Sequence, residues 1–261
     1  MKIAALHPLL PAALLAAGMR AALVGLRAVP FNADEAVVAL MARHILQGER
    51  PVFFYGQAYL GSADAWLIAA GFALFGQQVW AIRLTQTALW LGTLATGYLL
   101  ARRIYPRSRS PSDGAIARAA LLLLAAPTVT TVLYTTATLG GYGETLLIGN
   151  GLLLLALDIA AGRERWHHWL LLGLLAGFGF WTFGLIGVYL LPVGVVAARA
   201  IWKSPGKWPL AALAAAGATA GAAPWLAFTL RHGLAGIGEL GGAALGGFGP
   251  DYWAETGKHV L

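Results

Sequence analysis

The chain contains no cysteine and few charged residues. The absence of cysteine among its 261 residues excludes disulfides, thiolate metal sites and cysteine nucleophiles. Charged residues make up 11% of the chain, against about 25% in soluble globular domains. Hydrophobic residues make up 59%, and the mean hydropathy is +0.69. A soluble domain of this length cannot bury so much apolar surface, whereas a bilayer is itself apolar, so the composition predicts an integral membrane protein.

Several functional motifs are also missing. The sequence has no phosphate-binding loop, no dinucleotide fingerprint and no serine nucleophile elbow. Its six histidines show no metal-ligand spacing. The net charge is +7, yet no basic stripe with interleaved aromatic residues is present. We therefore expect no nucleic-acid partner and assign no metal ligands.

Seven apolar stretches approach the roughly 20 residues that a membrane-spanning helix needs. They predict an all-α polytopic membrane protein that forms a single transmembrane domain over residues 1–261. The first stretch is interpreted as an uncleaved helix, because Arg20 and Arg27 interrupt its apolar run; a cleaved signal peptide is the alternative. The predicted spans are 8–28, 82–101, 115–134, 143–161, 167–182, 184–201 and 208–230.

The distribution of charge predicts the orientation of these spans. Short cytoplasmic loops retain basic residues, so the side that holds most of them is taken as cytoplasmic. With a cytoplasmic N-terminus, that side carries 11 of the 18 cations and 3 of the 11 acidic residues. The cations are Lys2, Arg102, Arg103, Arg107, Arg109, Arg118, Arg163, Arg165, Arg199, Lys203 and Lys207, and the acids are Asp113, Asp158 and Glu164.

Residues 29–81 form a first external loop that is too apolar for a disordered linker. Asp34 is predicted to cap a helix over residues 35–47 that ends at Gly48. This helix has an apolar arc and a polar arc, which is typical of a helix lying on the membrane surface. A second helix is predicted over residues 62–75, beginning near Asp64 and ending at Gly76. It is interpreted as interfacial, and a spanning helix, which would change the topology after it, is the alternative.

Candidate catalytic residues begin with Asp34 and Glu35, because adjacent carboxylates at a membrane boundary are costly to keep there. Helix capping alone is the alternative explanation, and the two are compatible. Glu144 is the third candidate, predicted to lie in a short external loop on the same side. A solvated loop acid is its alternative.

Candidate substrate-binding residues lie in two further places. Tyr55, Gln57 and Tyr59 belong to an external segment that mixes aromatic, hydrogen-bonding and glycine residues, which suits a sugar or lipid headgroup; an interfacial aromatic belt is the alternative. Arg231 and His232 follow the last span, where arginine can bind phosphate. For this pair, a snorkelling interfacial charge is the preferred explanation from the residues alone.

Four pieces of the sequence together resemble the membrane glycosyltransferases of the GT-C superfamily. They are the acidic pair followed by Ala36, the segment 53–62, the segment 73–76 and Arg83 at the start of the next span. The chain is most similar to bacterial relatives of protein O-mannosyltransferases and of the lipid A aminoarabinose transferase. Residues 140–144 and 180–182 also resemble these bacterial members, and the specific motifs lie in the first third of the chain.

The resemblance implies an inverting glycosyltransferase of the bacterial inner membrane that takes a sugar from a polyprenyl-phosphate donor on the periplasmic or extracellular side. It assigns the catalytic acid to Asp34, its acidic neighbour to Glu35, a second acid to Glu144 and the phosphate-binding cation to Arg231. The implied partners are the donor, membrane lipids, and a lipid, glycan or protein acceptor. A divalent cation stays open as a cofactor, because members differ in requiring one.

The end of the chain bears on its completeness. Residues 241–247 are rich in glycine and alanine and are predicted to form an external loop, followed by acidic and aromatic residues up to 255. This ending resembles the middle of a loop, and full-length members of the superfamily are longer. We therefore expect the chain to be the N-terminal portion of a longer protein.

The reaction itself needs little beyond one carboxylate, because polyprenyl phosphate is already a good leaving group. Asp34 would act as the general base on the acceptor hydroxyl. The rival class is a transporter or flippase of lipid-linked solutes, which would concentrate charge near the middle of the membrane. A purely structural subunit is a third class, and it would tolerate amide substitution at Asp34 and Glu144.

Overall fold

The computed structural model of the protein describes residues 8–105 and 113–233. Within them the chain forms eleven α-helices, two short 3₁₀ helices and one antiparallel pair of strands. The glycine-rich segment 241–247 and the acidic residues that follow it lie outside the described residues. The elements are α1 (Leu9–Gly25), α2 (Ala33–Leu46), β1 (Phe53–Phe54), β2 (Gln57–Gly61), α3 (Ala63–Phe75), α4 (Val79–Ile104), α5 (Asp113–Ala125), α6 (Val129–Thr136), α7 (Tyr142–Ala160), α8 (Trp166–Thr182), η2 (Gly184–Ile186), α9 (Gly187–Lys203), η3 (Pro205–Lys207), α10 (Trp208–Gly221) and α11 (Ala223–His232).

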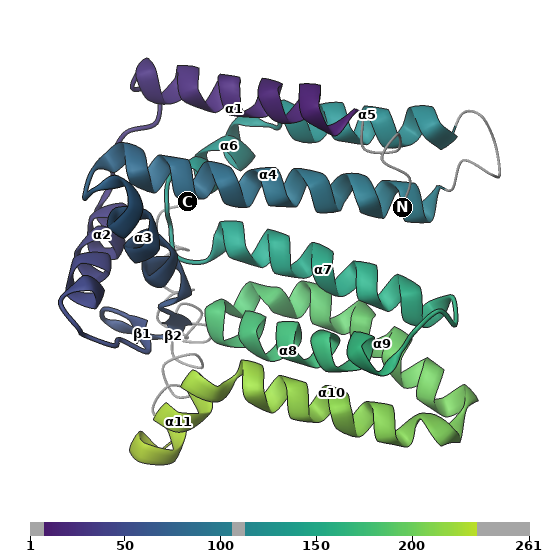
Figure 1. The fold of residues 1–261 in the computed structure, drawn as a ribbon. Coiled ribbons are helices and arrows are strands. Elements are labelled where there is room, and N and C mark those ends of the chain that lie inside the picture. Colours follow the sequence, from purple (N-terminus) through teal and green to yellow (C-terminus); the bar gives the residue numbers. More distant parts are fainter. Residues whose placement is uncertain (1–7, 106–112, 234–261) are drawn as a thin grey trace, which may run out of the picture.

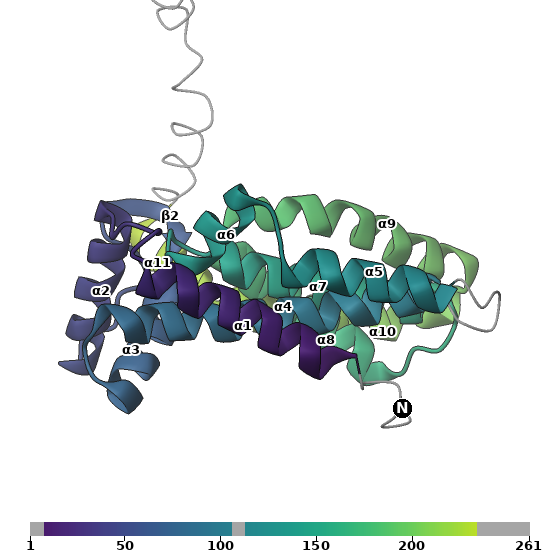
Figure 2. The ribbon, with the colours of Figure 1, turned by 90° about the horizontal axis from the view of Figure 1, so that it is seen from above.

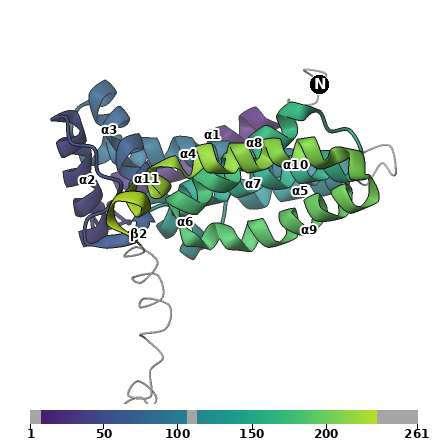
Figure 3. The same ribbon diagram turned by 90° about the horizontal axis from the view of Figure 1, so that it is seen from below.

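The long helices lie side by side, and the chain passes back and forth along them (Figure 1). One end of this bundle carries α2, α3, the β1–β2 hairpin and α11, and we call it the hairpin end (Figure 1). The opposite end carries the C-terminal ends of α4, α7 and α9, and we call it the basic end (Figure 1). The views from above and from below both show α2 and α3 at the hairpin end (Figures 2 and 3).

Each of the seven predicted spans coincides with one or two helices, but fewer satisfy a test of length and hydropathy. Helix α7 and the segment Gly184–Lys203 are long and apolar enough to cross a membrane by themselves. Three further pairs pass only together, because each is bent: α3 with α4 by 119°, α5 with α6 by 63°, and α10 with α11 by 67°. The described residues therefore offer two to five candidate spans, with α1 as a shorter apolar helix.

Helices α8 and α10 pack unusually closely, because both present small residues at a spacing of four. A Cβ atom added to Gly173 or Gly177 of α8 would lie 1.8 or 2.0 Å from a backbone oxygen of α10. Glycines 217 and 221 of α10 meet the backbone of α8 in the same way. Such backbone contact through small residues is characteristic of helix association in membranes.

Helix α1 is held to the bundle by a buried arginine. The Arg20 side chain is fully buried and donates hydrogen bonds of 2.5 to 2.6 Å to Thr135 and Thr136 at the end of α6. Its guanidinium also lies over the Trp90 ring, 4.9 Å from the centroid. These contacts offset part of the cost of a charge inside an apolar bundle.

Two expectations about the first external loop are wrong in detail. The N-cap of α2 is Asn32, whose side chain accepts from the backbone N–H of Glu35 at 3.0 Å, whereas Asp34 lies one residue inside the helix. The apolar arc of α2, with Val38 and Met41 at its centre, packs on α3 and is covered by protein instead of lipid. The loop also contains the β1–β2 hairpin, which an all-α prediction omits.

Candidate active site at the hairpin end

Four carboxylates from three helices gather at the hairpin end. Asp34 and Glu35 lie in the first turn of α2, Asp64 in the first turn of α3 and Glu144 in the first turn of α7. A carboxylate in a first turn interacts favourably with the positive end of the helix dipole. Glu144 is therefore a buried helix residue: the prediction that it lies in a loop is wrong, and its burial contradicts the alternative of a solvated acid.

The adjacent acids Asp34 and Glu35 point in different directions. Asp34 is exposed, whereas Glu35 is fully buried and forms an ion pair of 2.9 Å with Arg83 of α4. Burial raises the pKa of Glu35 to about 7, and the positive charge of Arg83 opposes this rise. Arg83 also donates to the carbonyls of Val29 and Pro30 at 3.3 and 3.4 Å, which ties the start of the loop to α4.

Asp64 and Glu144 form a buried pair of carboxyl groups, 80 positions apart in the sequence. Asp64 accepts hydrogen bonds from the Gln86 amide at 3.0 Å, the Gly140 N–H at 3.2 Å and the Thr138 hydroxyl. The two carboxyl groups are neighbours, and both residues are buried. Neither oxygen of Glu144 accepts a hydrogen bond from another described residue.

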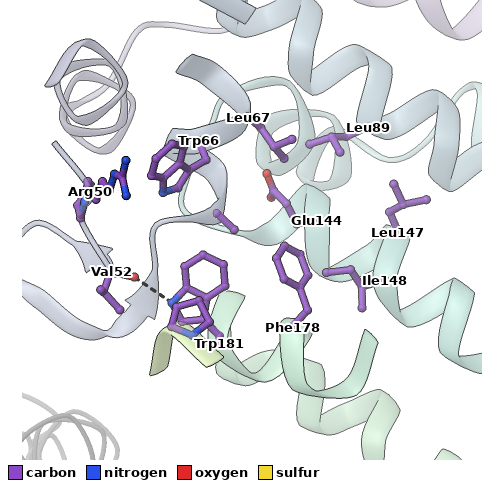
Figure 4. A pocket seen from close by; sticks show the side chains of 13 residues that line it. Arg50, Val52, Trp66, Leu67, Leu89, Glu144, Leu147, Ile148, Phe178 and Trp181 are labelled. Atoms are coloured by element: carbon purple, nitrogen blue, oxygen red, sulfur yellow. Dashed lines mark hydrogen bonds between the residues drawn. The ribbon is translucent and has the colours of Figure 1, made fainter. Parts of the chain in front are cut away.

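Glu144 lines a cavity of about 600 Å³, which we call the carboxylate cavity. Figure 4 shows the carboxylate of Glu144 among Leu67, Trp66 and Phe178, with Arg50 on the far side of the cavity. The remaining lining side chains are apolar, and they come from the loop before β1, α3, α4, α7, α8 and α11. They are Pro51, Val52, Ala63, Leu89, Leu147, Ile148, Trp181 and Pro224.

The hairpin is anchored to α8 beside this cavity. The indole N–H of Trp181 donates to the carbonyl of Val52 at 2.9 Å (Figure 4). Gly61 approaches the same residue so closely that an added Cβ would lie 2.2 Å from the Trp181 carbonyl oxygen. Position 61 therefore has to be glycine, because any side chain there would collide with the backbone of α8.

A second cavity, of about 610 Å³, lies across α7 and is lined by many hydroxyl groups. We call it the hydroxyl cavity. Its polar lining side chains are Thr93, Thr130, Thr131, Tyr134, Thr135, Tyr142, Thr145, Asn150 and Tyr189. Tyr142 stands between Tyr134 and Phe183 in edge-to-face contacts, with ring centroids 4.9 and 5.0 Å away. Asp34 lies in the first turn of α2 at the hairpin end, and Tyr142 of this cavity begins α7 at the same end (Figure 1).

The predicted substrate-binding residues of the hairpin do not line either cavity. The hydroxyl of Tyr55 contacts Nδ1 of His44 at 2.8 Å and donates to Glu49 at 2.9 Å. Gln57 and Tyr59 are half-buried in β2, whose neighbouring Leu60 packs into the core between α2 and α3. The segment therefore shapes the hairpin end, and the Tyr55 hydroxyl faces other residues of the loop.

Arg231 and His232 occupy the last turn of α11 and are exposed. The His232 ring stacks on Phe228, with centroids 4.3 Å apart, and Phe228 in turn packs against Phe53 of β1. These contacts bring α11 to the hairpin end, but the arginine that lines the carboxylate cavity is Arg50. Within the described residues no group of three or more His, Asp or Glu side chains is arranged to hold a metal ion.

Sequence reasoning did not single out Asp64, Arg50 or Tyr142 as functional residues. Asp64 was interpreted only as the start of a helix, because nothing in the sequence shows that it meets Glu144. One signal was available: Asp64 and Glu144 both open strongly apolar helices on the same predicted side of the membrane.

The chain is similar to a known protein family. Residues 63–228 match the protein family described as dolichyl-phosphate-mannose-protein mannosyltransferase, which is well over half of the chain. The match includes Asp64 and Glu144 and begins after Asp34.

Curated relatives point in the same direction. An undecaprenyl phosphate-alpha-4-amino-4-deoxy-L-arabinose arabinosyl transferase of Pseudomonas aeruginosa (strain UCBPP-PA14) is 30% identical over 181 residues, which is 65% of this chain and 31% of the relative. A second relative, an undecaprenyl phosphate-alpha-4-amino-4-deoxy-L-arabinose arabinosyl transferase 1 of Pseudomonas fluorescens (strain ATCC BAA-477), is 34% identical over 149 residues. The match covers 54% of this chain and 25% of the relative. The chain thus spans about a third or less of these relatives. No solved structure matches.

Proposed function

Since this chain belongs to the dolichyl-phosphate-mannose-protein mannosyltransferase family, we propose that it forms the catalytic end of a glycosyltransferase that uses a polyprenyl-phosphate sugar. The observation that carries the proposal is the gathering of Asp34, Asp64 and Glu144 between two cavities of similar volume and different chemistry. A two-substrate transfer needs two such chambers that meet at one catalytic group. The curated relatives are named for an undecaprenyl-phosphate aminosugar, so this donor is the first to test.

The carboxylate cavity suits the donor. Its apolar walls can hold the first isoprene units of the carrier, and Arg50 supplies a cation for the phosphate. The free oxygens of Glu144 can accept hydrogen bonds from a hydroxyl or amino group of the sugar, because no described residue occupies them. The hydroxyl cavity, with its threonine and tyrosine side chains, suits a polar acceptor.

Asp34 is the proposed general base. It is exposed at the hairpin end, where Tyr142 of the hydroxyl cavity begins α7, and Asn32 and the Glu35–Arg83 ion pair hold its helix turn in place. The acceptor oxygen attacks the anomeric carbon while its proton passes to the Asp34 carboxylate. The bond from that carbon to the phosphate oxygen breaks, and its electron pair leaves with the phosphate. One displacement of this kind inverts the anomeric centre.

The orientation forms part of the proposal. The basic end would face the cytoplasm of a bacterium and the hairpin end the periplasm, because seven of the 11 cations assigned above lie near the ends of α4 and α9 or in the connections after α7 and α9. They are Arg102, Arg103, Arg163, Arg165, Arg199, Lys203 and Lys207. The site would then open where a polyprenyl-phosphate sugar and an exported acceptor meet.

Sugar transfer in membranes tests the proposal. Membranes containing the chain are supplied with radiolabelled undecaprenyl-phosphate sugars, and the parent is compared with Asp34→Asn and with Glu49→Gln as the matched control. Glu49 is an exposed acid of the same loop that lines neither cavity. We expect Asp34→Asn to lose about 10²- to 10⁴-fold in rate and Glu49→Gln to keep the parental rate. Equal rates for the two variants would refute Asp34 as the base, and an inert parent with every donor would refute the transferase assignment.

A further inference from the structure

A third cavity lies at the basic end, far from the carboxylates. It has a volume of about 230 Å³ and is formed where α7 ends, where α9 ends and where η3 leads into α10. Its apolar wall consists of Ile159, Val196 and Ala200. Its polar wall consists of Arg199, Lys203 and Lys207, together with the hydroxyl group of Ser204.

The charge of this cavity is not neutralised by the protein. Arg199 and Lys203 are exposed, lie one turn apart on α9, and form no ion pair with any described residue. Lys207 is held by the carboxylate of Glu164, and the neighbouring Asp158 is paired with Arg103 and Arg163. Two of the three cations therefore remain available to an anion, and their spacing places both on one face of the helix.

The same face of α9 offers a path for an acyl chain. Val188, Leu191 and Val195 precede Arg199 at helical spacing and are 68 to 75% exposed, so an apolar stripe leads along the helix into the basic cavity. Trp202 and Trp208 are also exposed at this end, at 88% and 65%. Exposed tryptophans beside basic residues mark the level of the membrane–water interface.

We propose that this cavity binds the phosphate headgroup of an anionic phospholipid. Arg199 and Lys203 bind the phosphate, the Ser204 hydroxyl donates to it, and one acyl chain runs along Val195, Leu191 and Val188. The apolar stripe distinguishes this ligand from free phosphate, which would gain nothing from it. The proposal does not depend on the transferase assignment, because the cavity lies at the opposite end of the bundle from the carboxylates (Figure 1).

Native mass spectrometry of the detergent-solubilised chain tests the proposal. The chain is titrated with dioleoylphosphatidylglycerol, with dioleoylphosphatidylcholine and with inorganic phosphate. We expect phosphatidylglycerol to bind at one saturable site, and the other two probes to bind at least tenfold more weakly. Because a basic side chain near an anionic lipid contributes a factor of about five in affinity, Arg199→Gln should weaken binding about fivefold and the double variant with Lys203→Gln about thirtyfold.

The matched control is Arg118→Gln, which removes an exposed arginine of α5 that does not line the cavity. It should leave the affinity unchanged, and all variants should unfold at the parental temperature because the changed side chains are exposed. Equal weakening by Arg118→Gln would show diffuse attraction to a basic surface and overturn the proposal. Phosphate binding as tight as that of the lipid, or undiminished lipid binding by the double variant, would overturn it as well.

Discussion

The close contact between α8 and α10 makes a sharp prediction about stability. In Gly173→Ala the new methyl carbon would lie 1.8 Å from the carbonyl oxygen of Ala214, and in Gly177→Ala it would lie 2.0 Å from that of Ala218. Relief requires the two backbones to separate, because neither obstacle is a flexible side chain. A carbon in ordinary van der Waals contact stands about 3.5 Å away, so the helices must part by roughly 1.5 Å.

That separation has a cost that can be measured. Overpacking usually costs about 1–3 kcal/mol, and the separation also weakens the packing of the neighbouring small residues. We expect a loss of about 3 kcal/mol in the free energy of unfolding for each alanine variant. Sugar transfer should fall too, because α8 carries Phe178 and Trp181 into the carboxylate cavity.

Gly194→Ala is the matched control, since Gly194 lies within α9 and an added Cβ meets no atom within 4 Å. Its effect should stay within about 1 kcal/mol, in the stabilising direction that the helix propensity of alanine favours. The assay is unfolding of the purified chain in mixed micelles at rising mole fractions of sodium dodecyl sulfate, followed by tryptophan fluorescence. If Gly173→Ala unfolds at the same point as Gly194→Ala, the close approach of the two helices is wrong.

Three further predictions concern the hairpin end and the orientation. The pKa of Glu35 is raised from 4.5 to about 7, so the folded state binds the proton more tightly than the unfolded state. The free energy of unfolding should therefore be greatest below pH 4.5 and fall by about 3 kcal/mol as the pH rises through 7. Unfolding curves of Glu35→Gln should lack this dependence on pH. Since the chain has no cysteine, the variants Gln47→Cys and Ala161→Cys each carry a single cysteine that can be labelled in intact cells. A membrane-impermeant maleimide should label the cysteine at position 47 and leave the one at position 161 unlabelled. The reverse result would invert the proposed orientation. Arg50→Gln should raise the KM for the polyprenyl-phosphate donor about tenfold in the transfer assay, whereas Arg43→Gln, an exposed control outside the cavities, should leave it unchanged; equal KM values would remove Arg50 from the donor site.

Helix positions were predictable because they depend on local patterns. Apolar runs of sufficient length, interrupted by glycine, proline and charge, placed all seven predicted spans on helices, and Gly48 and Gly76 correctly marked the ends of α2 and α3. The cap of α2 was assigned to the wrong residue, because Asn32 and Asp34 are both good N-cap residues and only the backbone conformation decides between them. The bends between α3 and α4 and between α10 and α11 were not predictable from hydropathy, because hydropathy carries no information on the angle between consecutive helices.

The sequence by itself determined that the chain is an apolar helical protein and that an acidic pair lies at the start of a helix. These properties follow from composition and short-range order. Only the tertiary structure decided which acids work together, because Asp64 meets Glu144 across 80 positions while Glu35 turns inward to Arg83 and leaves Asp34 exposed. The physical reason is that burial and charge pairing are settled by packing between helices, and glycines such as Gly61 and Gly173 set how closely those helices approach.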